Sequence, residues 1–189
     1  MNKAALILIP LVIAGILVIG GFGIYNGLVS SQEEAKTAWA QVENQYQRRA
    51  DLIPNLVETV KGFAQQEKNV LEEVTRLRSQ WGEARQSGDI NKSVQAAQGL
   101  DGALGRLMLV VERYPELRSN QNFLKLQDQL EGTENRISVE RRRYNQAALN
   151  YNRKIRMFPG AFIAGPFGFE RMQVFEAEAG AKKAPTVKF

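Results

Sequence analysis

The residue types that most often carry catalysis are missing from this sequence, which holds neither cysteine nor histidine among its 189 residues. Thiol nucleophiles, disulfides, Cys/His zinc sites and histidine-dependent catalytic triads are therefore excluded. Carboxylates, arginines and hydroxyl groups remain as candidates for chemistry. A carboxylate-based enzyme would have to build its site from acidic residues such as Glu67, Glu134 and Glu140.

Four polar residues lie where helical periodicity calls for apolar side chains, namely Arg49, Glu67, Thr133 and Glu140. One interpretation is a polar site inside a helical bundle, since carboxylate bundles can hold metals. The di-metal pattern needs Glu-x-x-His pairs, which a chain without histidine cannot supply. We favour an interhelical ion-pair network that sets helix register, or exposure of these residues at a wide-faced helix end. We expect neither a metal nor a cofactor.

Two further polar clusters are candidates for partner contacts. Arg48, Arg49 and Asp51 flank Pro54, where they could form a docking tip, but we favour Asp51 as a cap of the helix that follows. The segment 131–137 is the most polar part of the last long helix, and its exposed or packed state is open. Its candidate interaction residues are Glu131, Glu134 and Asn135.

Nucleic-acid binding is not indicated. Arg141, Arg142 and Arg143 are consecutive, so on a helix they point about 100° apart and form no flat patch. No recognition motif or aromatic platform accompanies them. The glycines that could suggest a phosphate loop lie within the N-terminal apolar run.

That apolar run covers residues 4–24, which contain no charged side chain. At a rise of about 1.5 Å per residue, such a helix crosses the roughly 30 Å hydrocarbon core of a bilayer. It exceeds the about 7–15 apolar residues of a signal peptide, so we expect an uncleaved anchor over 4–29 after a short tail, 1–3. Lys3 before the anchor favours a cytoplasmic N-terminus and a body outside the cytoplasm, although Arg48 and Arg49 argue faintly for the reverse.

Beyond the anchor, near-heptad apolar spacing predicts four helices. The first covers about 31–52, and the second starts near Pro54, which either reverses or only kinks the chain. Asp89 should cap the third helix, and Ser119 or Asn120 the fourth. Short links favour antiparallel neighbours. We therefore predict an all-α fold, with an N-terminal transmembrane helix followed by an antiparallel, up-down, four-helix-type bundle of long helices over residues 30–157.

If all four helices reverse, the chain after Ile155 returns to the bilayer. Residues 158–176 form an apolar segment with too much Gly and Pro for a helix, and we expect it to rest in the head-group layer or to cap the bundle core. From Arg136 onward there are 11 basic and 4 acidic residues, a composition that favours anionic lipid. The tail 177–189 is expected to be disordered. The aromatic candidates for contact are Phe158, Phe162, Phe167 and Phe169.

Three motifs in order resemble the LemA family. They are RRADLIPNLVETVKG at 48–62, EGTENRI at 131–137 followed by RYN at 143–145, and YNRKIRMFP at 151–159 followed by AGPFGF at 164–169. The resemblance covers nearly the whole chain, from the anchor to about Phe175. It implies a bacterial single-pass membrane protein with a helical bundle domain and no established enzymatic activity. Family members are often associated with membrane proteostasis and envelope genes.

Together these features predict a single-pass, membrane-anchored scaffold or adaptor that acts through protein contacts and is not an enzyme. We expect it in the bacterial cytoplasmic (inner) membrane, with its soluble domain outside the cytoplasm. The expected partners are the lipid bilayer, further copies of the chain, and a membrane protease or another envelope protein. The alternatives are a lipid-binding or membrane-remodelling protein and, less favoured, a carboxylate-based enzyme.

Overall fold

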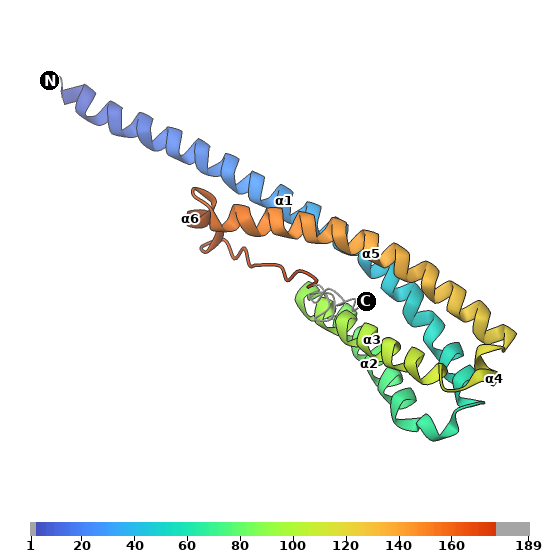
Figure 1. Cartoon of the computed structure of the whole chain (residues 1–189). Coiled ribbons are helices and arrows are strands. Elements are labelled where there is room, and N and C mark those ends of the chain that lie inside the picture. Colours follow the sequence, from blue (N-terminus) through green and yellow to red (C-terminus); the bar gives the residue numbers. More distant parts are fainter. Residues whose placement is uncertain (1–2, 177–189) are drawn as a thin grey trace, which may run out of the picture.

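The computed structural model describes residues 3–176, and the described residues contain helices and no strand, which confirms the all-α fold class. The order along the chain is α1, η1, α2, α3, α4, α5 and α6 (Figure 1). The tail 177–189, expected to be disordered, lies outside the described residues.

Helix α1, Lys3–Lys61, carries both the membrane segment and the first arm of the bundle. Its large apolar side chains from Leu8 to Phe22 are exposed, and this stretch is long and apolar enough to cross a membrane. An exposed apolar surface of this length would not be stable in water, because burying apolar area is the main driving force of folding. The N-terminal half of α1 is therefore the candidate membrane anchor, and it extends beyond the rest of the molecule (Figure 1).

The predicted helix start near Pro54 is wrong, because α1 runs through this residue and ends at Lys61. Proline has no N–H, so the carbonyl of Ala50 loses its usual donor within the helix. The Nε–H of Arg78 in α2 donates to that carbonyl at 2.8 Å and satisfies it. The chain reverses instead at residues 62–64. Asp51 consequently caps nothing, and its exposed carboxylate accepts a hydrogen bond from Gln47 at 2.7 Å.

The other helices follow their local signals. Helix α2 is Lys68–Gln86, after the short 3-10 helix η1 at Gln65–Glu67, and α3 is Ile90–Val111. Asp89 caps α3 by accepting from the N–H groups of Asn91 and Lys92, as predicted. Helix α4, Pro115–Arg118, links α3 to α5, Gln121–Arg156, which Asn120 caps. Of the two predicted caps for this last helix, Asn120 is therefore correct.

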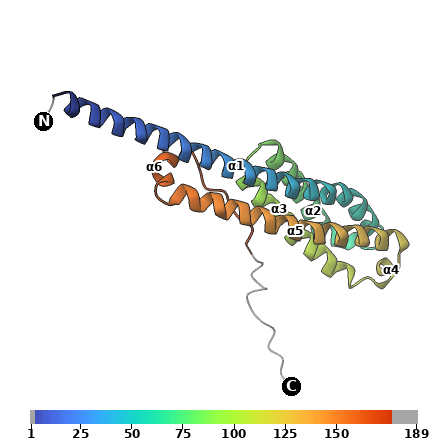
Figure 2. The ribbon, with the colours of Figure 1, turned by 90° about the horizontal axis from the view of Figure 1, so that it is seen from above.

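The long helices pack as two antiparallel pairs. Helix α5 lies along α1, and α3 lies along α2, which in turn packs on α1 (Figure 2). Helices α3 and α5 make little direct contact with each other. The bundle is thus closed on three sides and open along a cleft between α3 and α5.

The core is aromatic where the two pairs meet. Trp39 of α1 lies 5.3 Å from Tyr144 of α5 and 6.4 Å from Trp81 of α2, measured between ring centroids. Such edge-on pairs add about 0.5–1.5 kcal/mol each beyond their buried area. A smaller core of Leu28, Tyr151, Ile155 and Ala164 lies nearer the membrane segment, and it fixes the end of α5 to α1.

The segment after α5 is partly helical, which corrects the expectation of a wholly irregular chain: α6 covers Gly160–Ala164. Gly160 allows this turn to approach α5, because a Cβ there would lie 2.3 Å from the carbonyl oxygen of Lys154. The rings of Phe167 and Phe169 contact Tyr25 of α1, at 5.1 and 5.7 Å. The segment thus returns to the edge of the apolar part of α1.

Candidate binding cleft

Beyond α6 the chain turns back and lies extended in the cleft between α3 and α5. Asn152 of α5 accepts a hydrogen bond from the N–H of Met172 at 2.9 Å and donates to its carbonyl at 2.7 Å. Asn145 holds Phe175 in the same way, with both distances 2.9 Å. Each carboxamide therefore replaces the neighbouring strand that an extended residue would pair with in a sheet.

Three more side chains bind the main chain of this segment. Asn91 of α3 accepts from the N–H of Gln173 at 2.7 Å and donates to the carbonyl of Arg171 at 3.3 Å. The hydroxyl of Tyr144 donates to the carbonyl of Gln173 at 2.6 Å, and that of Tyr151 to the carbonyl of Glu170 at 2.9 Å. All of these bonds end on backbone atoms, so they recognise an extended chain and not its side chains.

The spacing of these groups explains how side chains on a helix can bind successive residues of an extended chain. Asn145 and Asn152 are seven residues apart, as are Tyr144 and Tyr151, which is about 10.5 Å along a helix. Their backbone partners are three residues apart, which is about 10 Å along an extended chain. The two repeats match, and each Tyr-Asn pair meets the same geometry. Burial raises the pKa of Tyr144 and of Tyr151, which keeps both hydroxyl groups protonated as donors.

One side chain of the segment is anchored in a pocket. Phe175 is 7% exposed, and its ring centroid lies 6.0–6.3 Å from the rings of Trp39, Tyr46 and Tyr144. The guanidinium of Arg141 lies 4.6 Å from the same ring centroid, within the range of a cation–π contact. An aromatic residue at this position is therefore the main side-chain-specific element of the contact, beside a weaker, exposed hydrogen bond from the side chain of Gln95 to that of Gln173 at 3.2 Å.

The pocket stands on a buried polar network that joins α1, α3 and α5. Arg49 is 3% exposed, and it pairs with Asp101 at 2.6 Å and with Glu134. Asp101 also accepts from the hydroxyl of Tyr46 at 2.8 Å and pairs with Arg141. The polar residue predicted in the apolar stripe of the first helix thus lies in an interhelical ion-pair network, at the centre of the cleft.

Beyond this network the cleft continues toward the α4 end as a cavity of about 500 Å³. Its apolar lining comes from both sides, with Leu104, Met108 and Val111 on α3 and Phe123 and Leu130 on α5. Its polar lining includes Glu112, Arg118, Glu131 and Glu134. The extended segment points along the cleft toward this cavity, since it passes Asn152 first and Asn145 afterwards.

The other predicted polar residues lie apart from one another. Glu67 accepts from the hydroxyl of Tyr114 at 3.2 Å and pairs with Arg113 at 3.1 Å, while Glu140 pairs with Arg143 of its own helix at 2.9 Å. In the described part of the chain, no group of three or more acidic residues could hold a metal ion. Glu67, Glu134 and Glu140 thus have separate partners, with no shared geometry for acid–base chemistry.

The remaining predicted positions lie on the surface or pack locally. Thr133 is buried and donates to the carbonyl of Leu130 at 2.7 Å. Glu131 and Asn135 are exposed on α5. Of the aromatic candidates, Phe158, Phe162 and Phe167 are exposed by 80, 75 and 64%, and Phe169 is partly buried against Tyr25.

Sequence reasoning missed the residues that hold the extended segment. Tyr144-Asn145 and Tyr151-Asn152 were recognised as parts of family motifs, but not as binding groups. The signal that could have found them is the repetition of a Tyr-Asn pair after seven residues. Asn91 carries no such signal, because its partners lie about 80 residues further along the chain.

Comparison with known proteins finds relatives named MamQ and LemA. Magnetosome protein MamQ 2 of Paramagnetospirillum magneticum is 30% identical over 175 residues, covering 80% of this chain and 64% of that protein. MamQ of Magnetospirillum gryphiswaldense is 30% identical over 180 residues, covering 82% and 66%. Protein LemA of Metamycoplasma hominis is 25% identical over 169 residues, covering 86% and 75%. The chain thus spans about two thirds of the length of the MamQ proteins.

The family comparison covers most of the bundle. Residues 38–189 match the LemA family, a region that includes both Tyr-Asn pairs, the buried network and the extended segment. On the match over these residues, the chain belongs to the LemA family.

Proposed function

We propose that this chain is a membrane-anchored helical adaptor whose cleft between α3 and α5 binds an extended segment of a partner protein. The observation that carries the proposal is the set of side chains on α3 and α5 that bind only the main chain of residues 170–175. Recognition of an extended peptide through hydrogen bonds to its main chain is a recurring mode of peptide binding.

The cleft has the two parts that such an adaptor needs. The Tyr-Asn pairs and Asn91 supply sequence-independent hydrogen bonds, and the aromatic pocket around Phe175 supplies selectivity for one side chain. A partner segment with an aromatic residue can replace the intramolecular segment, or a longer one can continue into the cavity beyond Arg141. The intramolecular segment then sets a threshold that a partner must exceed, because the two compete for the same groups.

Location supports the same role. The anchor in α1 holds the cleft close to a bilayer, and we propose that this is the bacterial cytoplasmic membrane, with the bundle outside the cytoplasm. The partners that we propose are further copies of the chain and a membrane protease or another envelope protein.

The test uses the full chain in detergent micelles and a fluorescein-labelled peptide of residues 168–176. In the chain, Phe175→Ala weakens the binding of the chain's own extended segment in the cleft and leaves α3 and α5 unchanged. We expect this variant to bind the peptide about tenfold or more tightly than the unmodified chain, measured by fluorescence polarisation. Adding Asn145→Ala and Asn152→Ala to the same chain should abolish binding, because four hydrogen bonds to the peptide are lost.

Two controls keep the result interpretable. A peptide carrying Phe175→Ala should bind weakly to every chain, since it cannot fill the aromatic pocket. Met172→Pro in the chain removes the N–H that Asn152 accepts and keeps Phe175, so it should also expose the cleft. If both chain variants unfold cooperatively on heating, yet neither binds the peptide, the segment is a fixed part of the fold and the proposal is wrong.

A further inference from the structure

A second groove adjoins the peptide cleft on the side nearer the apolar part of α1, and it shares Asn91, Asn152, Met172 and Gln173 with that cleft. It has a volume of about 1510 Å³ and lies between α5 and the extended segment, with Glu34 of α1 and Asn91 of α3 on its other sides. Arg143, Arg153 and Arg156 of α5 and Arg171 of the segment all line it. Two acidic residues, Glu34 and Glu176, line it as well, so the groove carries an excess of positive charge.

The arrangement on α5 follows helical geometry. Four lining residues of α5 are spaced by three and four residues and therefore form one stripe of the helix facing the groove, namely Arg143, Gln146, Asn150 and Arg153. Arg143 pairs with Glu140, and Arg153 donates to Asn150 at 3.2 Å. Among the described residues, no carboxylate lies within ion-pair distance of Arg153, Arg156 or Arg171. Three guanidinium groups therefore remain available to an anion.

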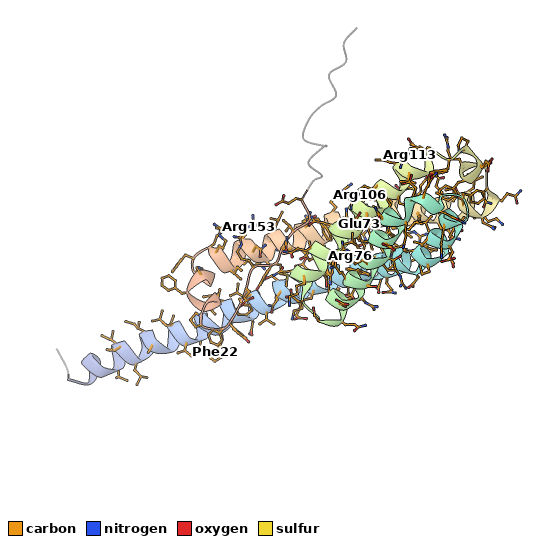
Figure 3. All side chains as sticks on the ribbon, turned by 90° about the horizontal axis from the view of Figure 1, so that it is seen from below. Phe22, Glu73, Arg76, Arg106, Arg113 and Arg153 are labelled. Atoms are coloured by element: carbon orange, nitrogen blue, oxygen red, sulfur yellow. The ribbon has the colours of Figure 1, made fainter. Side chains whose placement is uncertain are left out.

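One end of the groove lies near the apolar part of α1. Met157, a lining residue that directly follows α5, precedes the exposed rings of Phe158 and Phe162, and α6 then packs beside Leu28 of α1. Tyr25, which contacts Phe167 and Phe169, ends the apolar part of α1, and an aromatic residue there is typical of a membrane interface. Figure 3 shows Arg153 on the same half of the molecule as Phe22 of the anchor.

We propose that this groove binds the phosphate head group of an anionic phospholipid from the adjacent leaflet. Guanidinium groups bind phosphate oxygens with paired, charge-assisted hydrogen bonds, and the amides of Gln146 and Asn150 offer further donors. The acyl chains of that lipid would remain in the bilayer beside Phe158 and Phe162, which are exposed. A soluble anion would gain nothing from these rings, and for this reason the geometry points to a lipid.

The experiment is native mass spectrometry of the full chain released from detergent, titrated with phosphatidylglycerol and, separately, with phosphatidylcholine of the same acyl chains. We expect phosphatidylglycerol to bind at least tenfold more tightly. The triple variant Arg153→Gln, Arg156→Gln, Arg171→Gln should lose this preference. Each cation near an anionic surface is worth about fivefold in affinity, so three neutralised cations remove it entirely.

The matched control neutralises three arginines elsewhere, namely Arg76 of α2, Arg106 of α3 and Arg113 in the turn after α3. Figure 3 shows these three on the half of the molecule away from the anchor. This variant changes the net charge equally and should keep the preference. An unchanged preference in the first variant, or an equal loss in both, would overturn the proposal. If inorganic phosphate displaces phosphatidylglycerol at equal concentration, the ligand is a free anion, and the assignment to lipid is wrong.

Discussion

Asp101 is the residue on which the buried polar network depends, because it accepts from Tyr46 and pairs with both Arg49 and Arg141. Asp101→Ala leaves two arginines without this carboxylate in the interior. We expect the free energy of unfolding to fall by about 3–5 kcal/mol, as measured by chemical denaturation in micelles. Glu43→Ala breaks the more exposed pair with Arg85 and should cost no more than about 1 kcal/mol. Equal losses would show that the network is not a buried one.

Tyr144 gives the protein a specific alkaline sensitivity. Burial raises its pKa above the ordinary value of about 10, so it stays protonated in the folded chain after the unfolded chain has begun to ionise. The stability that protonated Tyr144 contributes is complete below about pH 10. It is lost as the pH rises further, with a slope of up to about 1.4 kcal/mol of unfolding free energy per pH unit. In denaturation experiments between pH 9 and 11, the free energy of unfolding of the Tyr144→Phe variant should fall less steeply than that of the unmodified chain. Identical slopes would contradict this assignment.

At this scale the sequence predicts some roles and not others. Arg49 stood out because a charged residue interrupts an apolar stripe, and burial of such a residue requires partners. Asn145 and Asn152 did not stand out as binding residues, because an amide on a helix surface fits solvent equally well. Their partners are 30 and 20 residues away, respectively, in an irregular segment, so no local pattern reveals the contact.

Helix α1 passes through Pro54 because a side chain from another helix replaces the missing donor. If this explanation is correct, Arg78→Met should destabilise the protein by about 1–2 kcal/mol by leaving the carbonyl of Ala50 unsatisfied. In a Pro54→Ala background the helix supplies its own N–H, so the same change should cost clearly less. A double-mutant cycle by chemical denaturation measures the difference. Additive effects would mean that Arg78 and Pro54 are independent.

The packing of α6 against α5 requires a residue without a Cβ at position 160. Gly160→Ala places a Cβ against the carbonyl of Lys154, so we expect α6 to detach and the segment 158–169 to become sensitive to limited proteolysis. Gly165→Ala is the matched control, because its Cβ would meet no atom within 4 Å and its φ is −62°. Comparable protease sensitivity in the two variants would contradict the steric explanation.

The elements show which sequence signals are sufficient. Asp89 and Asn120 bind N–H groups two and three residues ahead, so a local pattern locates these caps. The continuation of α1 past Pro54 depends on Arg78, 28 residues beyond the carbonyl it satisfies. Likewise, a Gly- and Pro-rich segment can form the short helix α6 because α1 and α5 pack around it. Tertiary contacts override local propensity in both places.

For the whole molecule, the orientation in the membrane is the prediction with the widest consequences. The chain has no cysteine, so a single Lys125→Cys on the exposed, membrane-distal part of α5 reports on location. We expect a membrane-impermeant maleimide to label it in intact spheroplasts, since Lys3 favours a cytoplasmic N-terminus. Labelling only after the membrane is permeabilised would place the bundle in the cytoplasm. A buried control, Ala148→Cys, should stay unlabelled on either side.

Because α1 is one continuous helix, it fixes the distance between the apolar segment and the rest of the bundle. From Tyr25 at the interface to Lys61 the helix rises about 54 Å, and α5 braces it along much of that distance. The helix is therefore a fixed spacer, because it holds the peptide cleft and the buried network at set distances along its axis from Tyr25. A tether on flexible linkers would sample many distances, whereas on the function proposed above the cleft is presented only to partner segments that come to this one distance from the apolar part of α1.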